Sequence, residues 1–173
     1  MISGTLRSII TAALIIGISG TALTQDGDDE PDPVILRMVL ADTATTLQKG
    51  ITAGELQGTP VSARFNMSAG DIHLSVYTAT ATGFIETILD PKTGNLISAK
   101  PITDTEDLAY ARIEKAAMEK ATVSLLIATE KAIAENAGAR AISAVPQLRK
   151  GQPIARVKLQ RSTDSIAVSE PLN

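Results

Sequence analysis

The chain has 173 residues, with 16 Lys and Arg, 19 Asp and Glu, one His and no Cys. This length suffices for one ordinary domain or two small ones. The formal net charge of −3 argues against a nucleic-acid binder, which needs a basic face to displace counterions from phosphates. The lack of Cys excludes disulfides, thiolate metal sites and thiol nucleophiles, and the single His73 excludes a metal cage built from several His.

The beginning of the chain has the pattern of a secretory signal peptide. Arg7 carries its one positive charge, residues 8–24 are uncharged and rich in Ile, Leu and Ala, and small residues precede the first carboxylate, Asp26. This order is typical of a signal that is cleaved. We predict a signal peptide at residues 1–22 and export to the periplasm, the cell surface or the exterior. The alternative is an uncleaved membrane anchor, which usually needs about 20 apolar residues.

An acidic stretch with two prolines follows, and we predict a solvated tether at residues 23–33. Its carboxylates repel one another and it holds little apolar surface to bury. A calcium-binding loop is the alternative interpretation, because carboxylate oxygens suit a hard cation. The alternating ligands, central Gly and distant Glu of a calcium loop are missing from this stretch.

The next part of the chain predicts a helix followed by an antiparallel meander. Residues 34–41 are apolar and fit either a strand or a short buried helix. Apolar residues at helical spacing, after Thr46 as N-cap, predict a helix over 45–57, although Gly50 and Gly54 weaken it by up to about 1 kcal/mol each. Alternating patterns then predict strands at 61–67, 72–78, 84–89 and from 96 onward.

The second part of the chain repeats this order. A capping box of Thr103 and Glu106 predicts a helix, and Ser124 precedes a further helix that ends at Gly138. Strands are expected at 139–145, 154–160 and 165–168. We expect the apolar face of the second of these helices to pack on the strand 154–160, through Leu125, Ala128, Ala132 and Ile133 on the helix and Ala155, Val157 and Leu159 on the strand.

The two parts match each other at one constant offset. Positions 61–63 meet 142–144, Gly70 meets Gly151, and Val76 meets Val157. The order of the predicted elements agrees at the same offset. The sequence therefore predicts an internal repeat.

Several of these residues resemble the PepSY family. In the second part, Ser124 at the helix start, the Ala-rich run 128–134 and Gly138 before a strand follow that family's pattern. In the first part, the turn Asp90-Pro91-Lys92-Thr93-Gly94-Asn95 resembles the family's closing Asp-x-x-Thr-Gly turn. The resemblance covers about residues 44–98 and 122–170, and the second copy lacks the closing turn.

The resemblance implies an α+β fold made of two PepSY-like units, each a helix packed on a small antiparallel sheet. The first unit would span 34–100 and the second, degenerate unit 101–173. Members of the family occur in propeptides of secreted metallopeptidases and as separate exported proteins, and restraint of peptidases is the role that the family implies. The family supplies no catalytic, metal or cofactor residues to place on this chain, so we expect none.

The candidate partner-binding residues are Arg156, Lys158, Arg161 and Val168. The three basic residues form a local cluster with Arg149 and Lys150, which suits an acidic partner or membrane headgroups, or is simply a solvated surface. The strand 165–168 is expected at a sheet edge, where a peptide can add through main-chain hydrogen bonds. The open strand faces, with His73, Ser75 and Tyr77 in one unit and Arg156, Lys158 and Gln160 in the other, are predicted to stay wet.

Isolated polar residues are interpreted structurally. Asp90 is expected to cap its turn, and His73 to face solvent. The helical charges Glu114, Lys115, Glu119, Glu130, Lys131 and Glu135 are expected on a solvated face with i,i+4 pairs. The leading hypothesis is thus an exported non-enzymatic binding module with a protein or peptide partner. The alternatives are a structural or membrane-anchored envelope protein, and a hydrolase that uses Ser and Lys, for which no nucleophile turn is present.

Overall fold

The computed structural model describes residues 32–68, 70–162 and 164–173. These residues form four helices and one antiparallel sheet of seven strands, so the predicted α+β class is confirmed. The predicted signal peptide at 1–22 and most of the predicted tether lie outside the described residues. Within the described ranges, the helices are all too short or too polar to cross a bilayer.

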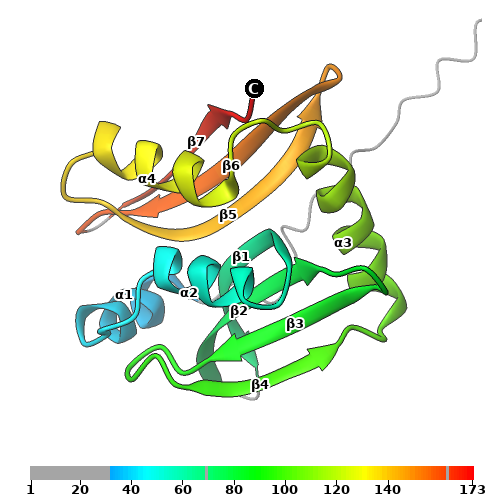
Figure 1. Ribbon diagram of the computed structural model, residues 1–173. Coiled ribbons are helices and arrows are strands. Elements are labelled where there is room, and N and C mark those ends of the chain that lie inside the picture. The colour runs from blue at the N-terminus through cyan, green and yellow to red at the C-terminus, as the bar shows by residue number, and fades with distance from the viewer. Residues whose placement is uncertain (1–31, 69, 163) are drawn as a thin grey trace, which may run out of the picture.

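The elements follow the predicted order along the chain. The helices are α1 (Pro33–Ala41), α2 (Leu47–Glu55), α3 (Thr105–Met118) and α4 (Leu125–Glu135). The strands are β1 (Thr59–Ser68), β2 (Asp71–Ala79), β3 (Phe84–Leu89), β4 (Leu96–Pro101), β5 (Arg140–Arg149), β6 (Gln152–Gln160) and β7 (Ser165–Pro171). Their order across the sheet is β4-β3-β2-β1-β5-β6-β7, so β1 lies in the middle and β4 and β7 form the edges (Figure 1).

Side-chain caps fix where the helices begin. Thr46 Oγ1 accepts a hydrogen bond from the Lys49 N–H at 3.2 Å, and Ser124 Oγ accepts one from the Ile127 N–H at 3.2 Å, as the sequence predicts. The segment 34–41 is a helix, capped by Asp32. The predicted capping box at Thr103 is wrong, because Asp104 caps α3 and accepts from the N–H groups of the helix's first turn.

The repeated spacing of the sequence is present in the elements. The interval from the start of β1 at Thr59 to the start of β5 at Arg140 equals the interval from β2 to β6. The irregularities in the ladders, between Pro60 and Ser62 and between Ala141 and Ser143, are separated by that same interval. The two halves are parts of one continuous sheet, joined where Ala63 pairs with Ala144 and Arg64 with Ser143.

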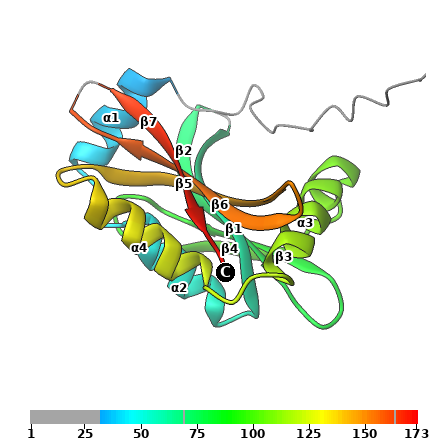
Figure 2. The same ribbon diagram turned by 90° about the horizontal axis from the view of Figure 1, so that it is seen from above.

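Helices α2 and α4 lie side by side on one face of the sheet, which we call the front face (Figures 1 and 2). Leu125, Ala128 and Ala132 of α4 are buried in one apolar cluster with Ala155, Val157 and Leu159 of β6, so the predicted helix–strand packing is confirmed. Ile133 is half-buried against the same cluster. The equivalent strand residues of the first half, including Ala63, Leu74 and Val76, belong to the cluster as well.

The opposite face of the sheet, which we call the back face, is covered in part by α3. This helix packs at one end of the sheet (Figure 1), where Ala111 is buried in a second apolar cluster with Val61, Tyr77 and Ala79. The prediction that Ser75 and Tyr77 stay wet is therefore wrong, since they are only 1% and 6% exposed. Gln160 is also buried, whereas His73, Arg156 and Lys158 on the back face are half-buried.

The two glycines that weaken α2 as a helix allow it to approach the sheet closely. A Cβ atom at Gly54 would lie 2.7 Å from Cγ1 of Val76 and 3.0 Å from Oγ1 of Thr78. Both neighbours are β-branched, so their rotamers are restricted. A Cβ at Gly50 would lie 2.5 Å from a terminal methyl of Leu74, a side chain that can adjust more easily.

We predict that Gly54→Ala lowers the free energy of unfolding, although Ala favours an isolated helix by up to about 1 kcal/mol. Overpacking a close contact typically costs about 1–3 kcal/mol, which exceeds that gain. Denaturant unfolding of Gly54→Ala, of Val76→Ala and of the double variant measures the coupling. The double variant should lose less stability than the two single losses added together. A stabilised Gly54→Ala variant would contradict this packing.

Candidate partner-binding face

The carboxylate of Glu114 lies between α3 and the back face of the sheet and accepts two short hydrogen bonds. Ser62 Oγ donates to Oε2 at 2.6 Å, and the Arg64 guanidinium donates to Oε1 at 2.6 Å. The Glu114 side chain is 4% exposed and that of Arg64 12%. The prediction that Glu114 belongs to a solvated helix face is therefore wrong.

The sequence of β1 places both donors on the same side. Ser62 and Arg64 are two residues apart in a strand and so point to the same face, while Ala63 and Phe65 enter the front core. On α3, Ala111, Glu114 and Ala117 are the buried residues, and their spacing of three puts them on one helical side. The signal in the sequence was Arg64, a lone cation in the predicted strand 61–67, because a cation needs an acidic partner when its strand is buried.

Tyr77 and Asp107 extend this arrangement, and we call the five residues Ser62, Arg64, Tyr77, Asp107 and Glu114 the polar cluster. The Arg64 guanidinium carbon lies 5.6 Å from the centre of the Tyr77 ring, a distance typical of a cation–π contact. The Tyr77 hydroxyl donates to Asp107 Oδ1 at 2.8 Å. A third helix–strand hydrogen bond therefore holds α3 on the back face.

Burial is the largest cause of the pKa shifts of Glu114 and Tyr77 in the polar cluster. Burial raises the pKa of Glu114 above its ordinary value, and the Arg64 charge and the hydrogen bond from Ser62 oppose that rise. Burial and the hydrogen bond to Asp107 raise the pKa of Tyr77, so its hydroxyl stays protonated and remains a donor. Ser62 is 1% exposed beneath α3, so its hydroxyl is not presented to a substrate. The polar cluster attaches a helix to a sheet.

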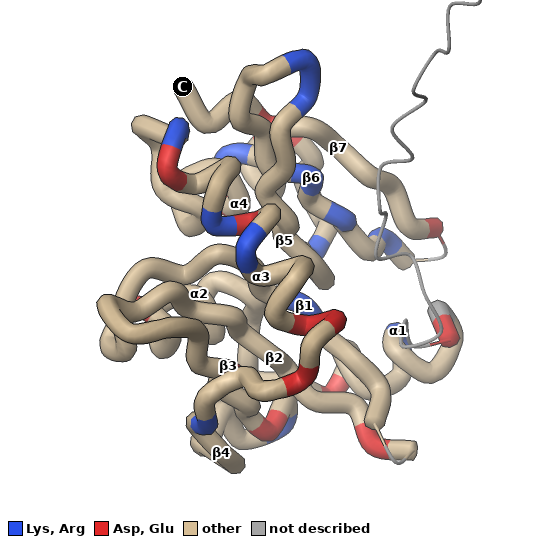
Figure 3. The backbone as a smooth tube through the Cα atoms, turned by 90° about the vertical axis from the view of Figure 1, so that its right-hand side faces the viewer, with Lys and Arg blue, Asp and Glu red and all other residues tan. Residues whose placement is uncertain are grey.

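The candidate basic residues lie on the other half of the back face. Arg156 and Lys158 are two residues apart on β6 and half-buried, and Arg161 follows the end of that strand and is exposed. Figure 3 shows positions of Lys and Arg along β6. Their neighbours across the ladder are uncharged: Arg156 pairs with Val145 and Ser169, and Lys158 with Ser143 and Ala167. We call Arg156, Lys158 and Arg161 the basic strand face.

Val168 does not join the basic strand face. It pairs with Val157, whose side chain is in the front core, and is itself half-buried against that core. The Leu172 N–H donates to the Pro153 carbonyl, and the Arg161 N–H to the Asp164 carbonyl. Antiparallel pairs alternate, so the Val168 N–H points toward β6, whereas those of Ala167 and Ser169 point away from the sheet. The Val168 N–H is therefore not available to a chain added at the outer edge of β7, although Val168 is a candidate partner-binding residue from the sequence.

Strand β7 itself is an edge of the sheet, as predicted. Ala167 and Ser169 are exposed, and their outward N–H groups are on the same strand that borders Arg156 and Lys158. The basic strand face and an open main-chain edge are thus adjacent. This arrangement can add an extended chain through backbone hydrogen bonds and attract carboxylates beside it.

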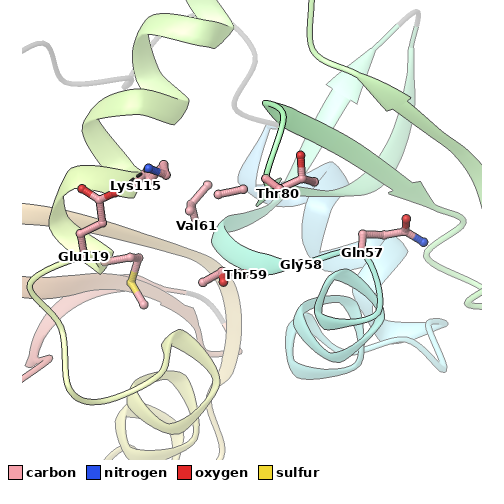
Figure 4. A pocket seen from close by; sticks show the side chains of 10 residues that line it. Gln57, Gly58, Thr59, Val61, Thr80, Lys115 and Glu119 are labelled. Carbon is pink, nitrogen blue, oxygen red and sulfur yellow. Dashed lines mark hydrogen bonds and ion pairs between the residues drawn. The ribbon is translucent and has the colours of Figure 1, made fainter.

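A shallow pocket of about 510 Å³ lies between α3 and the turns that precede β1 and follow β2. Gln57, Thr59, Val61 and Thr80 line it, and Lys115 and Glu119 form an i,i+4 ion pair on its α3 wall (Figure 4). The described residues that line it include no pair of carboxylates or hydroxyls in mutual hydrogen-bond contact that resembles a catalytic arrangement. The sequence did not predict this pocket.

The remaining single residues have structural roles. Asp90 Oδ1 accepts from the N–H and hydroxyl of Thr93 at 2.7 and 3.0 Å, so the predicted turn cap is confirmed, and these bonds lower the pKa of Asp90. Lys131 pairs with Glu135 as predicted, at 3.7 Å, and also with Glu170 at 2.8 Å. Within the described ranges, His, Asp and Glu form no group of three or more that could hold a metal ion.

We predict that Glu114→Ala lowers the free energy of unfolding by about 3 kcal/mol, because removing one member of a buried ion pair is costly. Glu119→Ala is the matched control on the same helix, since its ion pair with Lys115 is exposed and should contribute less than about 1 kcal/mol. Denaturant unfolding at neutral pH measures both losses. Equal losses in the two variants would contradict the buried role of Glu114.

The raised pKa of Glu114 also predicts a pH dependence. The folded protein retains a proton on this carboxyl at pH values where the unfolded chain, with its ordinary pKa of 4.5, has lost it. The contribution of this group to stability is therefore fully present below pH 4.5 and falls as the pH rises through the folded pKa. The difference in unfolding free energy between wild type and Glu114→Gln should decrease over that interval. A difference that increases with pH would show that the pKa is lowered instead.

Comparison with known proteins returned no match: no family model, no curated protein and no solved structure is similar to this chain.

Proposed function

We propose that this protein is an exported, non-enzymatic binding module made of two PepSY-like units, and that it binds a protein or peptide partner in the cell envelope. The observation that carries the proposal is the open edge of β7 beside the basic strand face. An extended acidic segment fits both features at once, with its backbone on the edge and its carboxylates near Arg156, Lys158 and Arg161.

The repeated spacing of the strands supports the proposal of two related units. β1 and β2 recur as β5 and β6 at one constant interval, and a helix precedes each pair on the front face. The strand pairing differs from the expectation of one small sheet in each unit, because the strands of both units belong to one sheet. Restraint of a peptidase is the specific role that follows from the family resemblance, because an edge strand can receive the extended chain that a peptidase presents or recognises.

A structural or membrane-anchored envelope protein is the second candidate. Helix α1, the first described element, exposes Val34, Ile35 and Met38 at 55%, 45% and 68%. An exposed apolar helix that follows the uncharged stretch 8–24 in the sequence suits association with a membrane or an envelope protein. Sequencing of the N-terminus in the exported fraction separates the candidates, because an anchored protein retains residues 1–22.

The test of the leading candidate is crosslinking in the native exported fraction, identification of the bound protein, and measurement of its affinity for defined variants. We predict that Ala167→Pro weakens binding at least tenfold, because it removes an N–H that points away from the sheet. Ala99→Pro on the opposite edge strand is the matched control. Ala99 is exposed, and the bond from the Ile102 N–H to the Phe84 carbonyl places its own N–H outward as well.

Circular dichroism and thermal unfolding establish that both proline variants are folded. Failure to recover any partner at physiological salt would contradict the binding function. Equal loss of affinity in both variants, or no loss in Ala167→Pro, would contradict docking at the β7 edge.

A further inference from the structure

Strand β7 forms one edge of the sheet (Figure 1), and its segment 165–169 carries none of the usual protections against pairing with another chain. Natural edge strands avoid such pairing by a charge, a Pro or a bulge. The segment is uncharged and contains no Pro, and the ladder of β7 with β6 is regular. The opposite edge, β4, contains Lys100 and has an irregularity in its ladder beside Ile88. The two edges therefore differ in how well they can receive a further strand.

The hydrogen-bonding groups of this segment alternate between the sheet and the outside. The N–H groups of Ile166 and Val168 point toward β6, so those of Ser165, Ala167 and Ser169 point away from the sheet, together with their carbonyls. These three residues are exposed and have small side chains on the back face. Ile166 and Val168 are half-buried against the front core. The edge is thus small and polar behind and apolar in front.

The segment is complementary to a second copy of itself in antiparallel orientation. With Ala167 opposite Ala167 of the second copy, Ser165 lies opposite Ser169. Every outward N–H of the segment then faces an outward carbonyl of the other copy, and every outward carbonyl faces an N–H. A pairing centred on Val168 would instead place Ser165 opposite Pro171, which has no N–H to donate. The hydrogen-bonding pattern therefore favours the pairing centred on Ala167.

The charges near the edge are compatible with this pairing. Asp164 of the second copy would lie opposite Glu170, but Lys131 binds the Glu170 carboxylate at 2.8 Å. On the back face, Lys158 borders the middle of the segment. The two copies of Lys158 would be three strand spacings apart, which is about 14 Å. This separation exceeds the screening length of about 8 Å at physiological salt, so their repulsion is weak.

We propose that the β7 edges of two copies of this protein pair antiparallel, centred on Ala167, and form a two-fold dimer with one continuous sheet. The interface is isologous, because the same strand contributes from both sides. It brings Ile166 of each copy opposite Val168 of the other, and β-branched side chains pack well on a pleated surface. The dimer occupies the edge that the proposed function assigns to a partner, but its formation requires no partner and its test contains none.

Sedimentation equilibrium of the protein purified from the exported fraction tests the dimer. A single strand pair is a small interface, so we expect a weak, reversible dimer whose fraction rises with concentration. Ala167→Pro removes an outward N–H and should raise the dissociation constant at least tenfold, whereas Ala99→Pro on β4 should leave it unchanged. A wild-type protein that stays monomeric at millimolar concentration would overturn the proposal and leave the edge to a different chain. Equal effects of the two variants would overturn it as well.

Disulfide trapping tests the register, because the chain has no Cys and a single introduced Cys can bond only to a second copy. Opposite residues of a hydrogen-bonded antiparallel pair have Cα atoms about 5.5 Å apart, which a disulfide can bridge. Under mild oxidation, Ala167→Cys should give at least tenfold more covalent dimer than Ala99→Cys. An equal yield from Ala99→Cys would overturn the proposed pairing.

A mixture of two variants checks the register independently. Ser165→Cys and Ser169→Cys should each give little covalent dimer alone, because equivalent positions in the two copies would lie about 13 Å apart along the strands. Mixed together, with one of them isotopically labelled, they should form a disulfide-linked heterodimer. Absence of that heterodimer, or equal yields from the separate variants, would contradict the pairing centred on Ala167.

Discussion

Strand β1 packs against helices on both of its faces, and much of the structure depends on these contacts. It lies in the middle of the sheet, with α2 and α4 against one face and α3 against part of the other. On the front, small and apolar residues such as Ala63 pack under α2 and α4. On the back, Ser62 and Arg64 are polar and are buried by α3, so each needs a partner there. Glu114 is the partner of both residues. The position of α3 therefore depends on these hydrogen bonds as well as on apolar packing.

The two halves have equivalent elements on the front face of the sheet but differ on the back face. Both halves place a helix over a hairpin on the front face, with the same interval between equivalent strands. On the back, α3 lies against strands of both halves, but its polar cluster uses β1 and β2 of the first half, whereas β6 of the second half carries Arg156 and Lys158. A buried ion pair contributes little net stability but penalises other arrangements of the same elements. The two halves therefore have similar front faces and different back faces.

Local signals in the sequence predicted the elements and the packing of α4 on β6, but they did not predict the contacts of α3 with the back face or the pairing of β1 with β5. Thr46 and Ser124 mark helix starts by hydrogen bonds within three residues, and alternation along 154–160 predicts most of β6 without any knowledge of its neighbours. The edge position of β7 also followed from the order of strands. The sequence analysis predicted that Glu114 is exposed, because the spacing of Glu and Lys along a helix does not indicate which side of the helix faces the sheet. The direction of the Val168 N–H depends on register, which a sequence pattern does not specify.

The contact between β1 and β5 has a consequence for how the chain folds. Every other pair of adjacent strands is consecutive in the sequence, whereas this one joins Ala63 to Ala144. The entropy lost in closing so long a loop grows only logarithmically with its length, but pairing between distant segments slows folding. Within each half, adjacent strands are joined by local hairpins, whereas the front core is shared by both halves. We therefore expect the pairing of β1 with β5 to form late in folding, and amide hydrogen exchange of its few bonds to follow the opening of the whole sheet rather than of either half.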